Sequence, residues 1–406
     1  QTLEGCPVRP AAGIIAEYNP FHLGHARQIA AIREILGADC AVAAVMSGSF
    51  VQRGEPAVLS KYVRAEAAVR CGVNLVLELP AVYAVASAET FARGAVALLH
   101  GAGVFTHLCF GSEAGDLAPL MAAAAYLDSE GYHQAVRRRL SEGVTFAAAR
   151  QAAVREGIGA AAECLRLPNN NLAVEYLRAL RGLESTMEPL TIRRFGAAHD
   201  SDEDSGCPSA SLIRRRMLAG EPWQAGVPAA MANLAEAEIA AGRGPASLRQ
   251  GERAVLAVLR GMTAEDLLPY DGGGEGLCRR FHQAVRRGRT LEEVLALCKT
   301  KRYPLSRLRR MAIAAYLRLP PPAEPPYLRL LAADGIGCAL LREIKRASAL
   351  PVITKPAGVR RLGPQAQALF AAEARCTALY DLCCPVLGTG TAGGEYAAGA
   401  IILNQE

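Results

Sequence analysis

The stretch Gly13-Ile14-Ile15-Ala16-Glu17-Tyr18-Asn19-Pro20-Phe21-His22-Leu23-Gly24-His25 joins an apolar, partly β-branched run to a segment with helical spacing. Proline cannot continue a sheet ladder and asparagine tolerates turn geometry, so the strand is expected to end at Asn19-Pro20. Apolar residues then recur at helical intervals as far as Leu36. The sequence therefore predicts a strand that passes directly into a helix, with His22 and His25 at the junction.

These two histidines have the residue type and the placement of phosphate ligands. His22 and His25 share a face if the first turn is helical, and Gly24 lets a bound group approach the backbone. A helix N-terminus suits phosphate, and imidazoles there can meet charge that develops on a phosphoryl oxygen. A solvated or capping histidine and a zinc site are the alternatives. Because no Cys-x-x-Cys or His-Glu-x-x-His pattern lies nearby, we expect a nucleotide here and no resident metal.

Strand and helix patterns alternate through the first half of the chain. Apolar runs predict buried strands at 40–46, 74–79, 105–110 and 189–195. Helical patterns lie between them at 60–71, 87–99, 116–166 and 172–183. Such alternation predicts an α/β fold with a doubly wound parallel sheet, Rossmann-like, in which ligands bind at the carboxyl ends of the strands.

A soft boundary lies between residues 220 and 228. We expect residues 1–225 to form the nucleotide-binding catalytic domain and residues 226–406 to form a mainly helical domain. Between Arg279 and Arg310 there are eleven Arg or Lys against two Glu, whereas the whole chain of 406 residues has a net charge of only +6. A solvated helical face and a surface for a phosphate backbone are both consistent with this stretch.

The cysteines and the apolar runs indicate the compartment. The twelve cysteines are irregularly spaced and include the adjacent pair Cys383-Cys384, which is typical of reduced, mostly buried thiols. We recognise no signal-peptide pattern and no uncharged run of membrane-spanning length. A cytoplasmic protein without a membrane partner is therefore expected.

Further short motifs follow the opening stretch in a characteristic order. They are Met46-Ser47-Gly48-Ser49-Phe50-Val51-Gln52-Arg53-Gly54-Glu55-Pro56-Ala57, Ser60-Lys61, Glu78-Leu79-Pro80, Phe110-Gly111-Ser112-Glu113, Pro168-Asn169-Asn170, Ile192-Arg193-Arg194, Ser209-Ala210-Ser211 with Ile213-Arg214, and Thr300-Lys301-Arg302-Tyr303-Pro304 with Arg307-Leu308-Arg309-Arg310. Together with residues 13–25, they resemble the bacterial tRNA(Met) cytidine acetate ligase family, which belongs to the HIGH nucleotidyltransferase superfamily. The resemblance spans most of the chain.

The resemblance implies a two-step reaction and a tRNA-binding role for the helical domain. Acetate attacks the α-phosphate of ATP and gives acetyl-adenylate and pyrophosphate. The N4 amine of the wobble cytidine of elongator tRNA(Met) then takes the acetyl group, and AMP leaves. ATP is thus the expected co-substrate, and Mg²⁺ is expected on the leaving pyrophosphate.

The resemblance also implies which residues hold ATP. They are Ile15, Ala16, Glu17, Tyr18, Asn19, Pro20, Phe21, His22, Leu23, Gly24, His25, Ala26, Arg27 and Gln28, together with Gly111, Asn169 and Arg194. Within this set, His22 and His25 are the catalytic candidates, as stabilisers of charge on the phosphates. Asn170 is an alternative to Asn169, because three asparagines stand in a row. The surroundings of His199 depart from the family pattern, which leaves its role open.

Two further groups of candidates follow. Ser209 and Ser211 are candidates for contact with the β- or γ-phosphate, and a plain helix cap explains them equally well. The candidates for the tRNA backbone are Lys301, Arg302, Arg307, Arg309 and Arg310. Lys61 and Arg64 are weaker candidates for a substrate contact.

Two other functions share part of these signals. A small-molecule adenylyltransferase has a similar histidine pattern but is usually a single compact domain, so the length and the basic helical half argue against it. A non-catalytic RNA-binding protein on the same scaffold would not need the histidine pair. The ligase is therefore the preferred hypothesis.

Overall fold

The computed structural model describes residues 9–144, 146–194, 208–272, 276–388 and 394–404. Its centre is a sheet in which five strands run parallel. They are β1 (Ala11–Ala16), β2 (Ala41–Ser47), β5 (Leu75–Leu79), β6 (His107–Ser112) and β7 (Glu188–Arg193). The strand order β5-β2-β1-β6-β7 confirms the doubly wound arrangement and the predicted strands.

Strands from the second half of the chain extend this sheet. β8 (Leu328–Ala333) pairs antiparallel with β5, while β9 (Val352–Ile353) and β10 (Ile401–Ile402) pair parallel with β8. The sheet is therefore mixed and not wholly parallel. Because β8, β9 and β10 lie beyond residue 226, the expected boundary at 225/226 does not separate the sheet from the helical part.

Alternate residues of each strand enter two separate cores on the two faces of the sheet. Ala12, Val42 and Val76 pack under α1 (Leu23–Leu36), α2 (Lys61–Arg70), α9 (Ala210–Ala219) and α10 (Ala229–Ala240). The opposite face is covered by α4 (Ala88–Ala102), α8 (Pro168–Gly182), α16 (Gly335–Ala347) and α17 (Pro364–Asp381). Gly13 allows α4 to lie close to β1, because a Cβ added there would meet the Leu99 side chain at 2.8 Å.

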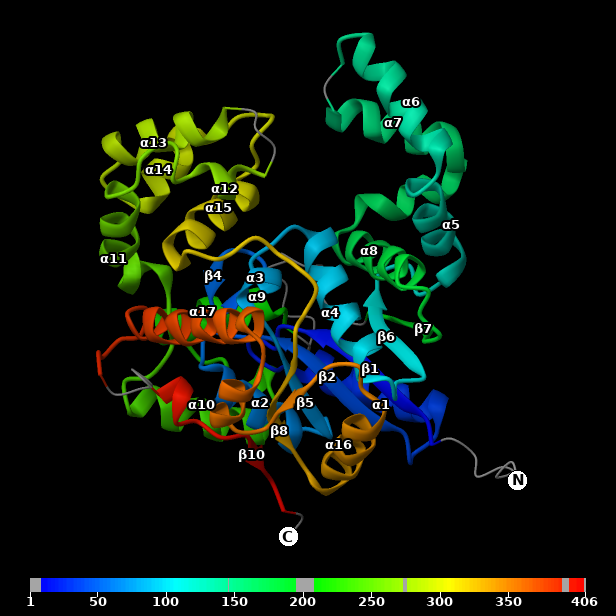
Figure 1. Ribbon diagram of the computed structural model, residues 1–406, viewed down its shortest axis with the longest axis vertical. Coiled ribbons are helices and arrows are strands. Elements are labelled where there is room, and N and C mark those ends of the chain that lie inside the picture. The colour runs from blue at the N-terminus through cyan, green and yellow to red at the C-terminus, as the bar shows by residue number, and fades with distance from the viewer. Residues whose placement is uncertain (1–8, 145, 195–207, 273–275, 389–393, 405–406) are drawn as a thin grey trace.

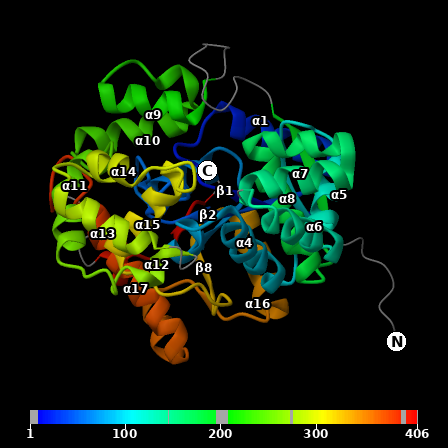
Figure 2. The same ribbon diagram turned by 90° about the horizontal axis from the view of Figure 1, so that it is seen from above.

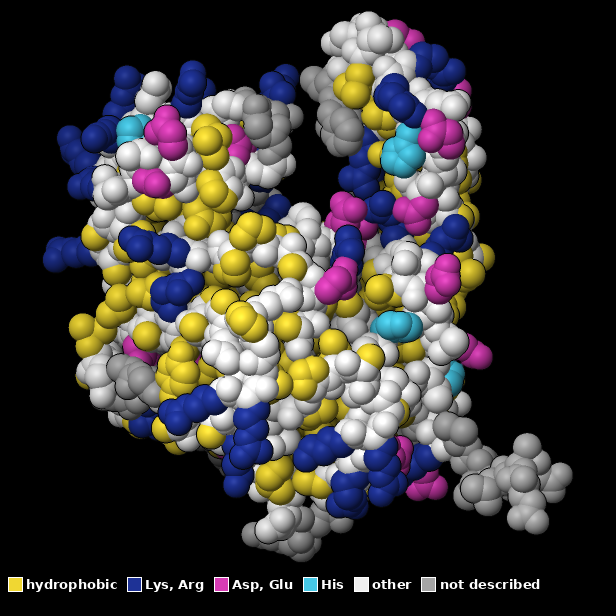
Figure 3. All heavy atoms as spheres, viewed as in Figure 1, with side chains coloured by type: hydrophobic (Ala, Val, Ile, Leu, Met, Phe, Trp, Pro, Cys, Tyr) yellow, Lys and Arg dark blue, Asp and Glu magenta, His cyan; other side chains and the backbone are white. Residues whose placement is uncertain are grey.

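Two helical arms extend from the same end of the sheet, with a hollow between them (Figures 1 and 3). One arm follows β6 and contains α5 (Leu117–Leu127), α6 (Glu130–Ser141), α7 (Phe146–Ile158), the 3-10 helix η1 (Gly159–Arg166) and α8. The other contains α11 (Leu248–Arg260), α12 (Leu268–Asp271), α13 (Leu277–Arg287), α14 (Leu291–Cys298) and α15 (Leu305–Leu317). Seen from above, the arms lie on either side of the central strands (Figure 2). The predicted helical character of both regions is confirmed.

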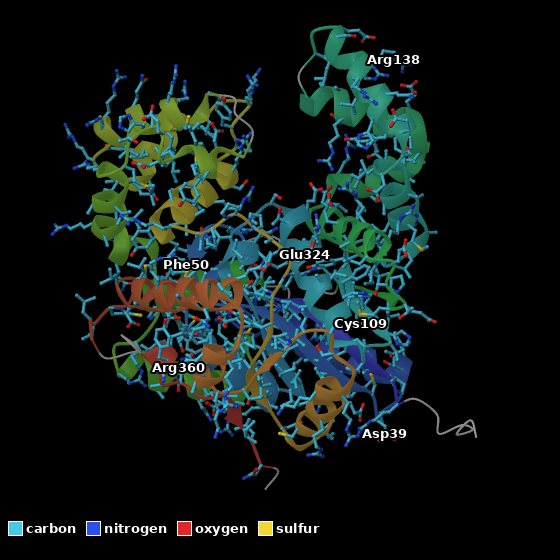
Figure 4. The ribbon with its side chains drawn as sticks, in the orientation of Figure 1. Asp39, Phe50, Cys109, Arg138, Glu324 and Arg360 are labelled. Atoms are coloured by element: carbon cyan, nitrogen blue, oxygen red, sulfur yellow. The ribbon has the colours of Figure 1, made fainter. Side chains whose placement is uncertain are left out.

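A short hairpin connects the sheet to the second arm. The segment after β2 forms β3 (Phe50–Val51) and β4 (Glu55–Pro56), and Glu55 forms an ion pair with Arg309 of α15. Phe50 lies against α17, with its ring centroid 6.3 Å from that of Tyr380 (Figure 4). The loop that follows β2 is thus anchored at both ends of the hairpin.

A buried ionic cluster joins α2 and β5 to the C-terminal segment. Lys61 lies 2.5 Å from Glu78 and 2.7 Å from Glu395, and Arg329 of β8 pairs with both carboxylates. Glu373 of α17 lies beside this cluster and accepts a hydrogen bond from the backbone N–H of Ala81. Burial, and then the charge of Glu78, raises the pKa of Glu373 to about 8. Lys61 is therefore a structural residue and has no access to a substrate.

The remaining short elements are α3 (Ala81–Ala84) and the 3-10 helices η2 (Gln224–Gly226), η3 (Pro356–Arg361) and η4 (Gly394–Tyr396). The ten cysteines among the described residues are free thiols, and eight of them are buried, as predicted. Among these residues, no helix has both the length and the apolar character needed to cross a membrane.

Candidate active site

The two histidines at the junction of β1 and α1 cap the helix with their rings. His22 is the N-cap residue, and its Nδ1 accepts the backbone N–H of Gly24 at 3.0 Å. Nδ1 of His25 accepts the backbone N–H of His22 at 3.1 Å, and the ring centroids are 3.8 Å apart. An Nδ1 atom that accepts a hydrogen bond carries no proton, so in each neutral ring the proton is on Nε2. The caps thus leave two Nε2–H donors for a ligand.

Both rings are neutral at physiological pH. Burial, and then the charges of Arg194 and Arg214, lowers the pKa of His22 to about 3. Burial, followed by the effects of His22 and Arg194, holds the pKa of His25 well below its ordinary value. Neutral imidazoles that donate from Nε2 stabilise an anion as fixed dipoles and do not exchange protons with it.

A pocket opens beside these histidines at the carboxyl ends of β1 and β6. Predicted residues that line it are Ile15, Ala16, Glu17, Tyr18, Asn19, His22, His25, Gln28, Gly111, Asn169, Arg194, Ser209 and Ser211. A smaller adjoining cavity shares several of these residues and adds Gly24 and Arg27. Pro20, Phe21, Leu23 and Ala26 line neither cavity, and Phe21 is fully buried in the core.

One end of the pocket is cationic. Arg194 follows β7. Its charge contributes to the lowered pKa of both histidines, so its guanidinium lies near them. Arg214 of α9 donates to the carbonyl of Asn19 at 2.6 Å and to Oγ of Ser211 at 3.2 Å. Ser209 caps α9, because its Oγ accepts the backbone N–H of Leu212 at 3.2 Å. Arginines, helix N-termini and serine hydroxyls together form a site suited to phosphates.

The neighbouring asparagines have different roles. Asn170 is 1% exposed, and its Oδ1 accepts the backbone N–H groups of Glu113 and Ala114. Asn169 lines the pocket, and its Nδ2 donates to Oε1 of Glu113 at 2.6 Å. Glu113 also accepts the backbone N–H groups of both asparagines at the start of α8. Asn170 therefore fixes the loop after β6, and Asn169 is the one that faces the pocket.

Comparison with known proteins identifies the family. The family model described as HIGH Nucleotidyl Transferase matches residues 10–390. A tRNA(Met) cytidine acetate ligase of Syntrophomonas wolfei is 35% identical over 96% of this chain and 98% of its own length. The chain belongs to the tRNA(Met) cytidine acetate ligase family. A relative with the same name from Thermoanaerobacter sp. is 38% identical over 84% of this chain and 88% of its own length.

Solved structures of Thermotoga maritima TmcAL have the same fold. The apo structure has a TM-score of 0.91 and is 29% identical, and the match covers 98% of this chain and 100% of that one. The structure bound with alpha-thio ATP has a TM-score of 0.89 and is 30% identical, over the same shares of the two chains. The family that the motifs predicted is therefore confirmed.

Several residues that line the pocket beside the histidines were not among the predicted site residues. Gln52 and Arg53, from the hairpin, and Phe91, Tyr176 and Arg214, from helices, also line it. The motif around Arg53 was visible in the sequence, but only the fold shows that the hairpin reaches the pocket. Arg64, a weak candidate, is fully buried and donates to backbone carbonyls, so it has no access to a substrate.

The candidates for RNA contact differ in their exposure. Lys301 and Arg302 are exposed at the start of the turn before α15. Arg307 donates to the carbonyl of Asp271 at 2.8 Å, and Arg309 is paired with Glu55. Arg310 is partly buried, and burial, followed by the charge of Arg307, lowers its pKa. His199 lies outside the described residues.

Proposed function

We propose that this protein activates acetate with ATP and acetylates N4 of the wobble cytidine of elongator tRNA(Met) in the cytoplasm. Acetate attacks the α-phosphate, and pyrophosphate leaves. The cytosine amine then attacks the acetyl carbon of acetyl-adenylate, and AMP leaves. Membership of the ligase family supports both steps.

The observation that carries the proposal is the pair of capping histidines beside the arginine end of the pocket. Adenylyl transfer increases charge on the phosphoryl oxygens, and preorganised donors aimed at that charge lower the barrier. The two Nε2–H groups are such donors, because each ring is fixed by the backbone N–H that its Nδ1 accepts. The N-terminus of α1 adds its dipole, and Arg194 adds a full charge.

We expect Mg²⁺ to arrive bound to ATP. Ser209 and Ser211 are hydroxyl residues that line the pocket close to Arg214. Mg²⁺ keeps several waters and binds readily to phosphate oxygens, so the hydroxyls of Ser209 and Ser211 would be its protein neighbours. When bound, it would neutralise charge on the leaving pyrophosphate.

The hollow between the two arms supports the proposal that the substrate is a large molecule such as tRNA. It opens above the end of the sheet that carries the pocket (Figures 1 and 3). The wobble base is in a single-stranded loop, so it can be splayed out without breaking a helix. Lys301 and Arg302 are the exposed candidates for contact with the phosphate backbone.

The test is the incorporation of labelled acetate into purified tRNA. With ATP and elongator tRNA(Met), we expect N4-acetylcytidine at the wobble position and one AMP for each acetyl group. A dinucleotide product formed only with a small phosphorylated acceptor would instead identify an adenylyltransferase. Binding of tRNA without any ATP turnover would identify a non-catalytic RNA-binding protein.

A further inference from the structure

Two short motifs that lie far apart in the sequence meet between the second arm and the pocket. Glu55, on the β3–β4 hairpin, forms an ion pair with Arg309 of α15, and their side chains are 30% and 31% exposed. The backbone of α15 also lies directly against the hairpin, because a Cβ added at Gly54 would meet the carbonyl carbon of Arg309 at 2.8 Å. The second arm therefore holds the hairpin through a charge pair and through a close backbone contact.

The tip of the hairpin belongs to the pocket. Gln52 and Arg53 occupy this tip and line the pocket beside the histidines. The backbone N–H of Gln52 donates to Oε1 of Glu17 at 2.8 Å, which joins the tip to the end of β1. The N–H of Gly54 donates to the carbonyl of Val51 at 2.9 Å and closes the turn. Gln52 and Arg53 thus lie between a contact with β1 on one side and contacts with α15 on the other.

The hairpin is too small to set its own position. Each strand has two residues, and an isolated two-stranded hairpin is at best marginally stable in water. Phe50, at its base, is buried in the same apolar cluster as Leu308 and Met311 of α15 (Figure 4). This buried contact fixes the base of the hairpin, and the contacts of Gly54 and Glu55 with α15 fix its outer end.

We propose that Glu55 and Arg309 are positioning residues for the nucleotide, because their ion pair holds the hairpin against α15 and keeps Gln52 and Arg53 at the pocket. The inference rests on the proposed function, in which this pocket binds ATP. A guanidinium that is already held in place binds an anion with less loss of conformational freedom than one that must first be ordered. Arg309 then acts on the pocket and is not part of the RNA-binding surface.

The test is a double-mutant cycle on the ion pair, with Glu55→Gln, Arg309→Gln and the double variant. We expect each single variant to raise the KM for ATP in acetate-dependent pyrophosphate exchange by about 3- to 10-fold, with kcat within about twofold of the wild type. The double variant should raise KM no further than either single variant, because the same pair is lost in all three. A loss of folded protein would lower kcat and leave KM unchanged, so this split separates positioning from instability.

A matched ion pair and a second variant complete the test. Glu238→Gln of α10 is the control, because Glu238 pairs with Arg243 and does not line the pocket, and its KM and kcat should equal those of the wild type. Gly54→Ala should raise KM as well, since its Cβ would push the hairpin away from α15. Gly143→Ala is the control for that variant, because Gly143 also has a positive φ but a Cβ there meets no described atom within 4 Å.

Three results would overturn the proposal. They are KM effects that multiply in the double variant, an unchanged KM in both single variants, and a weaker affinity for tRNA in Arg309→Gln with an unchanged KM for ATP. The dissociation constant of ATP, measured without acetate or tRNA, should also rise in both single variants. A wild type that binds ATP but shows no exchange with acetate would refute the proposed function, while the rise in that constant would still support the positioning role.

Discussion

At the scale of single residues, the sequence predicts where the two histidines lie but not their protonation. His22 and His25 follow from the spacing and the strand end. Their tautomers depend on backbone N–H groups that only the cap geometry places, and their charge depends on Arg194 and Arg214, which are more than 160 positions away in the chain. The contact between Glu17 and the backbone N–H of Gln52 is hidden for the same reason, because only the fold brings the hairpin to the end of β1.

Neutral histidines predict a particular pH profile. Because burial lowers the pKa of His22 to about 3 and holds the pKa of His25 well below its ordinary value, we expect neither ring to titrate near pH 6.5. The rate of acetate-dependent ATP–pyrophosphate exchange should show no step near the ordinary histidine pKa of about 6.5. A step there in the wild type that is absent from His25→Asn would contradict this assignment.

At the scale of elements, local patterns predict most of the sheet and miss its extension. Apolar runs between helical patterns identify β1, β2, β5, β6 and β7. β8 is also a short apolar run, but such a run does not distinguish a strand from a buried helical segment. Its pairing with β5 joins residues more than 250 positions apart, which no local pattern records. The sequence does not predict the β3–β4 hairpin, because each of its two strands has only two residues, too few to form a recognisable strand pattern.

The buried ionic cluster predicts a stability that depends on pH. In the folded protein Glu373 keeps its proton up to about pH 8, whereas in the unfolded chain it loses it near 4.5. The folded state therefore binds more protons in this interval, and its stability falls as the pH rises through it, by up to about 1.4 kcal/mol for each pH unit. Glu373→Gln mimics the protonated form and should remove this loss.

Thermal melts of both proteins from pH 5 to 9 measure this effect. The melting temperature of Glu373→Gln should exceed that of the wild type at pH 9 by more than it does at pH 5. Parallel curves for the two proteins would mean that Glu373 is ionised in the folded state.

At the scale of the whole molecule, the arms and the pocket predict that RNA binding and nucleotide binding are separable. Lys301→Glu with Arg302→Glu should weaken tRNA binding. It should also make the slope of log K against log salt concentration shallower, by about 0.9 for each lost phosphate contact. The affinity for ATP should stay the same, because neither residue lines the pocket. Arg309 is a poorer choice for this test, since reversal of its charge would place two carboxylates together at Glu55.

Filter binding at several salt concentrations provides the measurement. The matched control is Lys345→Glu with Arg346→Glu on α16, which lies at the opposite end of the molecule from the arms (Figure 1). Equal weakening by both double variants would indicate an effect of net charge and not a surface on the second arm.

The most direct test of the central claim is ATP–pyrophosphate exchange without tRNA, measured with and without acetate. The wild type should exchange only when acetate is present, and His22→Ala should lose about 100-fold or more of that rate. His100→Ala, an exposed histidine of α4, serves as the control and should exchange like the wild type. Exchange that does not need acetate, or full exchange by His22→Ala, would contradict acyl-adenylation at the capping histidines.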